Sequence, residues 1–172
     1  GEGAGSIQAV DRQGGLDHAS HAYGYGVSLT LLQLAHAYNI IANDGLDAGV
    51  HFVKPSQLRS RRVISARLAR TVRSILMHVT DKDGSGFRAH LAGSSVAGKT
   101  GTALISGPTG YQVGRVNASF VGMVPAMEPQ LVVAVVIHKP GPGWRFGGVV
   151  AAPVFRQIVS DSLPMLKRRH VG

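Results

Sequence analysis

Three short segments in the second half of the chain constrain its fold most. Residues 94–103, 117–124 and 131–138 are rich in β-branched residues and glycine, and loops containing glycine and proline separate them. Such segments are typical of strands, and their close spacing predicts a meander of neighbouring strands. The third segment is apolar without alternation, which predicts that both of its faces are covered.

Two helices are expected before these strands. Thr30 and Gln33 have the spacing of a capping box, and apolar residues then recur at helical spacing until Asn43-Asp44-Gly45 ends the pattern. Ser65 is predicted to cap a second helix. Its expected apolar face consists of Leu68, Val72, Ile75, Leu76 and Val79.

A last helix is expected over residues 152–163. Pro153 would lie in its first turn, where the missing N–H needs no partner. Helices followed by strands and a final helix indicate an α+β fold, with an antiparallel sheet covered by helices. We find no internal repeat and no linker long enough to divide residues 1–172 into two domains.

The composition excludes several classes of function. The chain has 18 Lys+Arg against 9 Asp+Glu, a formal charge of +9, but no aromatic residue interleaves with the arginines between residues 53 and 86. We therefore predict no nucleic-acid site, and a solvated helix face plus a frayed tail instead. The arginine cluster includes Arg73, and Arg67, Arg70 and Ser74 are expected opposite the apolar face. The longest apolar run, 131–137, is too short for a membrane span. The absence of cysteine excludes disulfides and thiol catalysis.

Residues 93–100 match the pattern of a phosphate-binding P-loop, G-x-x-x-x-G-K-[ST]. That loop needs a helix directly after its Lys-Thr, so that backbone N–H groups face the phosphate. Here Gly-Thr-Ala-Leu-Ile-Ser-Gly-Pro follows, which leaves a helix no room. A nucleotide-binding protein is therefore the weakest of three alternatives.

Two other patterns imitate metal sites. Asp81, Asp83 and Ser85 resemble the start of an EF-hand loop, but the position that should hold a bidentate Glu is Ala92. His18 and His21 could share a helical face, yet no third ligand stands at a suitable spacing. We predict a glycine-rich turn at residues 81–86 and no metal site.

The residues Lys99-Thr100-Gly101-Thr102 have a different interpretation if they lie on a strand. They would then present a cation, two hydroxyls and a position without a side chain on an edge that an extended peptide can approach. Hydroxyl and ammonium groups together suit the terminal carboxylate of that peptide. This is the K-T-G element of penicillin-recognising serine enzymes.

The surrounding sequence strengthens this interpretation. Gly24-Tyr-Gly-Val-Ser-Leu-Thr-Leu-Leu-Gln-Leu-Ala-His-Ala-Tyr38 with Ala42-Asn-Asp-Gly45 resembles a segment of class B penicillin-binding proteins. Later blocks of that family are matched, in order, by residues 96–103, 118–125 and 147–155. Residues 1–5 are similar to the Gly-Glu-x-Ala-Gly of division-type members. The resemblance covers nearly the whole chain and is weakest at residues 46–90 and after 163.

The resemblance implies roles for individual residues. Lys99 would bond to and tune the catalytic groups across a cleft, and Gly101 would leave space for the substrate. The hydroxyls of Thr100 and Thr102 would receive the carboxylate of the donor peptide or of a β-lactam. The backbone N–H of Thr102 would belong to the oxyanion hole. Tyr111, Trp144 and Phe146 fall in expected loops where the family builds an aromatic rim; ordinary packing under loops is the alternative.

The chain departs from the family pattern in one respect. None of its lysines follows a serine by three residues, and no Ser-x-Asn occurs, so the nucleophile, base and proton relay of the family are absent from residues 1–172. We therefore expect this chain to be the C-terminal part of a transpeptidase domain. An upstream half, carrying Ser-x-x-Lys and Ser-x-Asn, would complete it.

The resemblance further implies serine acyl transfer at D-Ala-D-Ala during septal peptidoglycan synthesis, which needs no cofactor. The implied partners are peptidoglycan stem peptides, β-lactams, the upstream half and division proteins. The implied location is the periplasmic side of the inner membrane, through an N-terminal anchor outside this chain. A non-catalytic fragment that binds wall peptides or docks to proteins is the second alternative.

Overall fold

The computed structural model describes residues 3–7, 24, 26–53, 55–57, 59–107, 110–141 and 143–169. The α+β class expected from the sequence is confirmed. Short helical turns lie at His78–Thr80 (η1) and Phe87–Ala89 (η2). The helices are α2 (Leu31–Ala42), α3 (Ala66–Met77) and α4 (Gly147–Arg169). The strands are β1 (Ser6–Ile7), β2 (Val27–Ser28), β3 (Leu46–Asp47), β4 (Arg61–Arg62), β5 (Ala97–Gly107), β6 (Gly110–Val124) and β7 (Leu131–His138).

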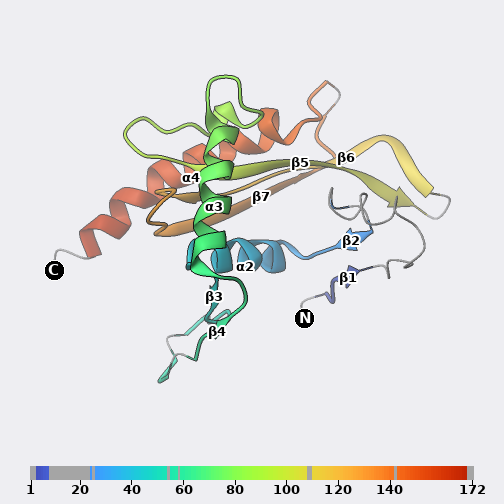
Figure 1. Cartoon of the computed structure of the whole chain (residues 1–172). Helices are drawn as coiled ribbons and strands as arrows, with labels where there is room; N and C mark the ends of the chain where they lie inside the picture. The colour runs from blue at the N-terminus through green and yellow to red at the C-terminus, as the bar shows by residue number, and fades with distance from the viewer. Residues whose placement is uncertain are drawn as a thin grey trace.

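Strands β5, β6 and β7 form the predicted antiparallel meander, in the order β5-β6-β7. The first two strands are longer than predicted, because Leu104 pairs with Val116 and Ser106 with Tyr111 beyond a register shift. This extension projects past the helices (Figure 1). The prediction that Tyr111 lies in a loop was therefore wrong, since backbone pairing continues where the glycine-rich sequence suggested a break.

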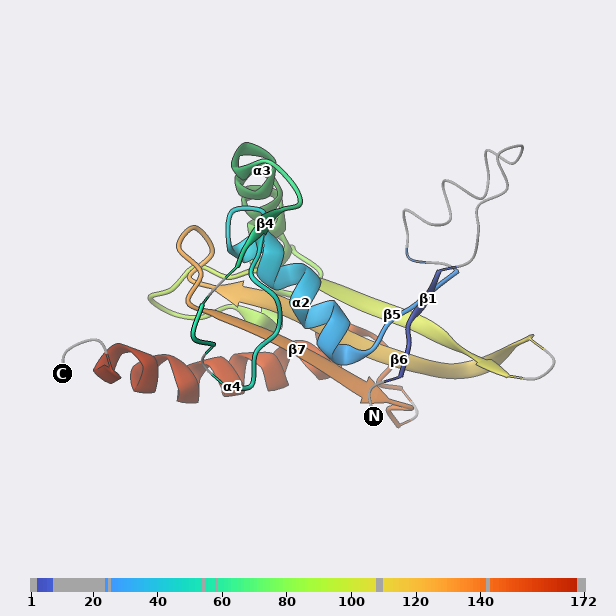
Figure 2. The ribbon, with the colours of Figure 1, turned by 90° about the horizontal axis from the view of Figure 1, so that it is seen from below.

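Helices cover both faces of the sheet (Figure 2). On one face, Phe155 of α4 packs against Phe120 of β6, with ring centroids 4.8 Å apart. On the other face, residues of α2 and α3 pack around Ala97 and Met123. Val133 of β7 contacts the first cluster and Val132 the second, so the predicted coverage of both faces of this strand is confirmed at these residues.

The two predicted helix caps are confirmed. The Gln33 backbone N–H donates to Thr30 Oγ1 over 3.1 Å, and the Thr30 N–H donates to Gln33 Oε1 over 2.9 Å. Ser65 Oγ accepts from the Leu68 N–H at the start of α3. After α2 the chain turns at Gly45, whose φ is 82°. A side chain there would lie 2.2 Å from the Ile64 carbonyl oxygen, so the turn requires glycine.

Helix α4 begins at Gly147, earlier than the predicted residue 152. Pro153 therefore lies inside the helix, where it cannot donate to the Val149 carbonyl one turn before it. Arg88 Nη1 donates to that carbonyl instead, over 3.3 Å. This substitute donor explains why the helix tolerates a proline that the sequence placed in a first turn.

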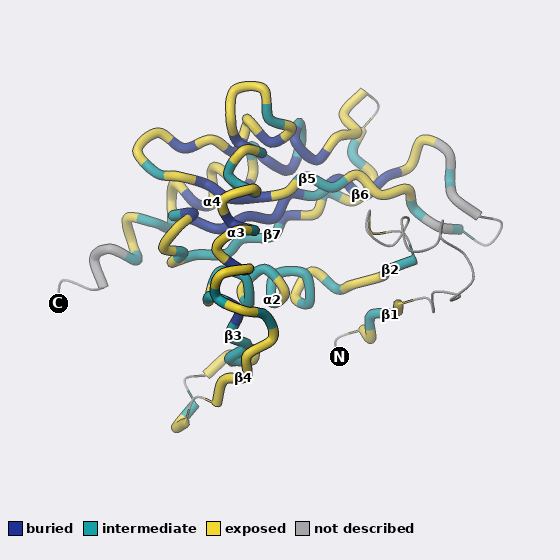
Figure 3. The backbone as a smooth tube through the Cα atoms, viewed as in Figure 1, coloured by how far each residue is buried: buried dark blue, intermediate teal, exposed yellow. Residues whose placement is uncertain are grey.

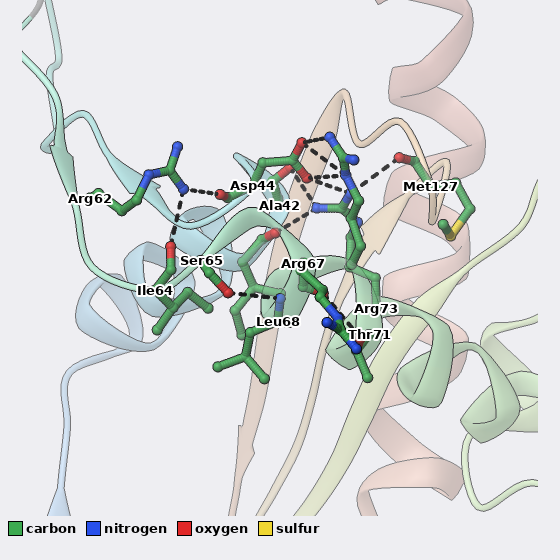
Figure 4. Close-up of polar contacts among 12 residues, drawn as sticks. Ala42, Asp44, Arg62, Ile64, Ser65, Arg67, Leu68, Thr71, Arg73 and Met127 are labelled. Carbon is green, nitrogen blue, oxygen red and sulfur yellow. Dashed lines mark hydrogen bonds and ion pairs between the residues drawn. The ribbon is translucent and has the colours of Figure 1, made fainter.

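The predicted solvated face of α3 is correct for Arg67 and Arg70 but wrong for Arg73, whose side chain is 3% exposed. Arg73 Nη2 lies 2.7 Å from Asp44 Oδ1, and its Nη1 donates to the Ile41 carbonyl over 2.7 Å (Figure 4). Arg70 binds the other oxygen of Asp44 over 2.6 Å. Hydrogen bonds from Arg70 and then Arg73 lower the pKa of Asp44 to about 2.

The predicted apolar face of α3 and the turn after it is partly correct, because Leu76 and Val79 pack against the core clusters. Ala69 and Arg73 are the buried residues of this helix, whereas Leu68 and Ile75 are 49% and 62% exposed. Buried segments gather in β5–β7 and α4, while the β3–β4 end is largely exposed (Figure 3). Within the described part of the chain, no helix combines the length and apolar content needed to cross a bilayer.

Candidate functional site

Residues 99–102, here called the KTGT segment, lie on β5 at the edge of the described sheet. The strand continues through Lys99 and Thr100 to Gly107, so no helix follows the Lys-Thr pair. A P-loop requires that helix to present N–H groups to phosphate. The nucleotide-binding alternative is therefore contradicted, and the strand placement that the K-T-G interpretation requires is observed.

In the KTGT segment, the backbone N–H and C=O groups of every second residue point to the outer edge of the sheet, away from β6. The Val96 carbonyl accepts from Thr80 Oγ1 on the outer edge, whereas the Ser95 carbonyl accepts from the Ala126 N–H on the β6 side. Backbone groups alternate along an antiparallel strand, so Thr100 and Thr102 also direct theirs outward. Lys99 Nζ donates to the Thr100 carbonyl over 2.9 Å, in agreement with this direction.

The side chains of the KTGT segment divide between the two faces of the sheet. Thr100 and Thr102 lie on the α4 face, where the Gly147 N–H donates to Thr102 Oγ1 over 3.3 Å. Lys99 lies on the opposite face, which α2 and α3 cover further along the strand. Lys99 and Thr102 are exposed, and Thr100 is half-buried. The structure thus places the Thr102 hydroxyl at the start of α4, with Thr100 beside Gly148.

Two glycines allow α4 to begin against these threonines. A side chain on Gly147 would lie 2.0 Å from the Ser119 carbonyl oxygen, and one on Gly148 would lie 1.9 Å from the Ser85 carbonyl oxygen. Any larger residue would push the helix away from the strand. The N-terminus of a helix carries a partial positive charge of about half an elementary unit, which favours a carboxylate beside Thr102.

Ser85 contacts the segment, although the sequence suggested only a turn there. Its Oγ lies 3.1 Å from Thr100 Oγ1. No sequence signal connects these residues, because the chain passes through η2 and a further loop between them. Gly101 also has a role that the resemblance did not imply. A side chain on Gly101 would lie 2.4 Å from Ser119 Oγ, so this glycine leaves room for the Ser119 side chain.

The remaining predicted site residues lie in different parts of the structure. Trp144 and Phe146 lie in the loop before α4 and are 55% and 66% exposed. Tyr111 lies on β6, in the projecting part of the hairpin. His18 and His21 lie outside the described residues. In the ranges that the structure describes, no three metal-ligating side chains gather into a site.

A match to a family model identifies the family of this chain. The model of the penicillin binding protein transpeptidase domain matches residues 1–160. The chain belongs to this family. The family resemblance drawn from the sequence is thereby confirmed by a match that extends over most of the chain.

Relatives agree with this assignment. The chain is 38% identical over 169 residues to a probable peptidoglycan D,D-transpeptidase PenA of Neisseria flavescens, covering 96% of this chain and 42% of the relative. It is 34% identical over 164 residues to the peptidoglycan D,D-transpeptidase FtsI of Escherichia coli K12, covering 95% and 28%. The chain thus spans less than half the length of these relatives.

Solved structures share its fold. The transpeptidase domain of Burkholderia pseudomallei penicillin-binding protein 3 superposes with a TM-score of 0.82 at 39% identity, covering 94% of this chain and 50% of that one. Penicillin-binding protein 3 of Mycobacterium tuberculosis, complexed with ampicillin, gives a TM-score of 0.80 at 31% identity, covering 99% and 41%. The α+β arrangement is therefore that of transpeptidase domains.

Proposed function

We propose that this chain is the C-terminal part of a peptidoglycan D,D-transpeptidase domain. The observation that carries the proposal is the edge position of the KTGT segment beside the N-terminus of α4, in a chain of the transpeptidase family. The nucleophilic serine, its lysine base and the Ser-x-Asn relay would come from an upstream half. The greater length of the relatives and the absence of Ser-x-x-Lys here support this division.

In the proposed reaction, the serine oxygen attacks the carbonyl carbon of the penultimate D-Ala of a donor stem peptide. The peptide bond to the terminal D-Ala breaks, and the serine ester forms as that D-Ala leaves with the proton. An amine of a second stem peptide then attacks the ester and restores the serine hydroxyl. A β-lactam would form the same ester by opening its ring. No oxidant, metal or cofactor enters these steps.

The KTGT segment would serve this reaction in three ways. Thr100 and Thr102 would hold the donor carboxylate, helped by the positive end of α4. The outward N–H of Thr102 would stabilise the oxyanion, which develops charge only in the transition state. Lys99 would tune the upstream catalytic groups. Trp144 and Phe146, both exposed beside this edge, and Tyr111 on the hairpin would form the rim of the cleft.

We further propose a division-type role in septal peptidoglycan, with division proteins as partners of the whole protein. The similarity to FtsI of Escherichia coli supports this assignment. The whole protein would act at the periplasmic side of the inner membrane, through an anchor outside residues 1–172. The peptide substrates and β-lactams would bind at the edge of β5.

Labelling with a fluorescent penicillin tests the proposal. The 172-residue chain is labelled alone and in a mixture with the upstream segment from the same gene. Covalent label on the upstream segment, formed only in the mixture, is expected if this chain completes a split active site. Labelling in neither sample would support the non-catalytic alternative. Label on this chain alone would reveal a nucleophile within residues 1–172 and refute the proposed division.

A further inference from the structure

A small pocket lies between η2 and α4 and does not include the KTGT segment. Its volume is about 220 Å³. Figure 1 shows the segment after α3 curling over α4, and η2 contacts that helix. We call it the cationic pocket; its lining residues are Phe87, Arg88, His90, Pro153 and Arg156. The mechanism proposed above uses none of them.

The cationic pocket concentrates positive charge without a counter-charge. Two arginines and a histidine are among its lining residues, and none of those residues is acidic. Across the described ranges, neither Arg88 nor Arg156 takes part in an ion pair. Asp161, an acidic residue further along α4, accepts hydrogen bonds from Gln157 instead. The two arginines therefore retain donors for an anion from outside.

The shape of the pocket restricts which anion it suits. Arg88 uses Nη1 on the Val149 carbonyl, which fixes its guanidinium and leaves its other N–H groups available. The rings of Phe87 and His90, two of the lining residues, stack at 20° with centroids 6.0 Å apart. Planar guanidinium groups match the planar carboxylate.

We propose that the cationic pocket is a second binding site of this protein, for a carboxylate of the peptidoglycan strand. This inference rests on the proposed function, which supplies the carboxylate-bearing polymer. A polymer held at the KTGT segment presents further carboxylates nearby, and a second contact on the same protein raises the effective concentration of the strand. The pocket would thus retain peptidoglycan beside the cleft rather than take part in the acyl transfer.

Co-sedimentation with purified insoluble peptidoglycan tests this inference. The double variant R88Q/R156Q is compared with R67Q/R115Q, which removes the same charge from exposed arginines on α3 and β6. The pocket variant is expected to bind about tenfold more weakly, and the control within about twofold of the parent, because charge-assisted contacts depend on position. Parent binding should fall by a similar factor when the peptidoglycan carboxylates are converted to amides.

Four results would overturn the inference. Equal losses in the two double variants would indicate general charge attraction, and unchanged binding of the pocket variant would show that the strand avoids the pocket. Insensitivity to amidation would exclude a carboxylate. Loss of binding to a poly-glutamate peptide, with peptidoglycan binding intact, would assign the pocket to an acidic protein segment. Circular dichroism confirms that each variant is folded.

Penicillin labelling separates this inference from the proposed function. The pocket variant mixed with the upstream segment should be labelled at the parental rate, because its arginines lie outside the acylation site. No labelling even with the parent chain would refute the proposed function. Normal labelling with unaltered sedimentation of the pocket variant would refute this inference alone.

Discussion

Exchanging Arg73 for methionine is expected to destabilise the fold far more than the same exchange at Arg70. Both arginines lie on α3 and bind the carboxylate of Asp44, but their side chains are 3% and 60% exposed. The comparison therefore holds the residue type, the helix and the ion-pair partner constant. It varies the burial of the guanidinium.

The magnitude follows from the groups that each arginine satisfies. Without Arg73, the Ile41 carbonyl and the Asp44 carboxylate each lose a partly buried donor, and an unsatisfied buried group costs about 1–3 kcal/mol. The apolar methionine offsets part of this loss. We expect a net decrease of about 2–4 kcal/mol in the free energy of unfolding, a large share of the roughly 5–15 kcal/mol of a typical domain. The exposed pair of Arg70 is worth about 0.2–1 kcal/mol.

Urea denaturation, followed by circular dichroism, measures both variants against the parent chain. Equal slopes in urea would show that the unfolding transitions are comparable. The reasoning would be refuted by unfolding free energies of the two variants within about 0.5 kcal/mol of each other, well inside the difference expected between a buried and an exposed pair. Burial of Arg73 would then contribute nothing beyond its contact with Asp44.

Three further predictions concern the site and its support. In the complete protein, T102A or K99A should lower the rate of penicillin acylation by about 10²–10³-fold with the fold retained. Acylation at the parental rate would show that the KTGT segment is not part of the active site. S85A should lower the same rate by about two- to tenfold, as expected for one neutral hydrogen bond, while S85T restores it. The depressed pKa of Asp44 stabilises the fold above about pH 4, and this contribution should disappear as the pH falls towards 2, whereas D44N should remove that dependence in acid titrations of stability.

Much of the architecture could be predicted because its signals are local. The capping residues Thr30 and Ser65 act within one turn of the chain, and both caps were found where the sequence indicated. The strands could be predicted from their β-branched residues. The wrong predictions concern residues whose partners are distant in the sequence. Arg73 is buried where it binds Asp44, and Arg88 supplies the donor that Pro153 lacks inside α4.

In the candidate site, too, local sequence patterns could be predicted and contacts between distant residues could not. The type and order of residues 99–102 indicated a peptide-binding edge without any knowledge of the sheet. Ser85 could not be found, because its contact with Thr100 depends on how the chain returns over α4. The tight approach of Gly148 to the Ser85 carbonyl is likewise invisible in the sequence, although the Gly147-Gly148 pair marks where it occurs.

Hydrogen-bond geometry explains how the two threonines would be prepared for a carboxylate. A hydroxyl has one proton to donate and can accept two bonds. Thr102 Oγ1 accepts from the Gly147 N–H, so its proton is directed elsewhere. If Ser85 donates to Thr100 Oγ1, the proton of Thr100 is likewise released towards the open edge. Both hydroxyls would then donate to the same anion, and their orientation would be fixed before it binds. The modest effect expected for S85A follows, because it removes the alignment of one donor and leaves the donor itself in place.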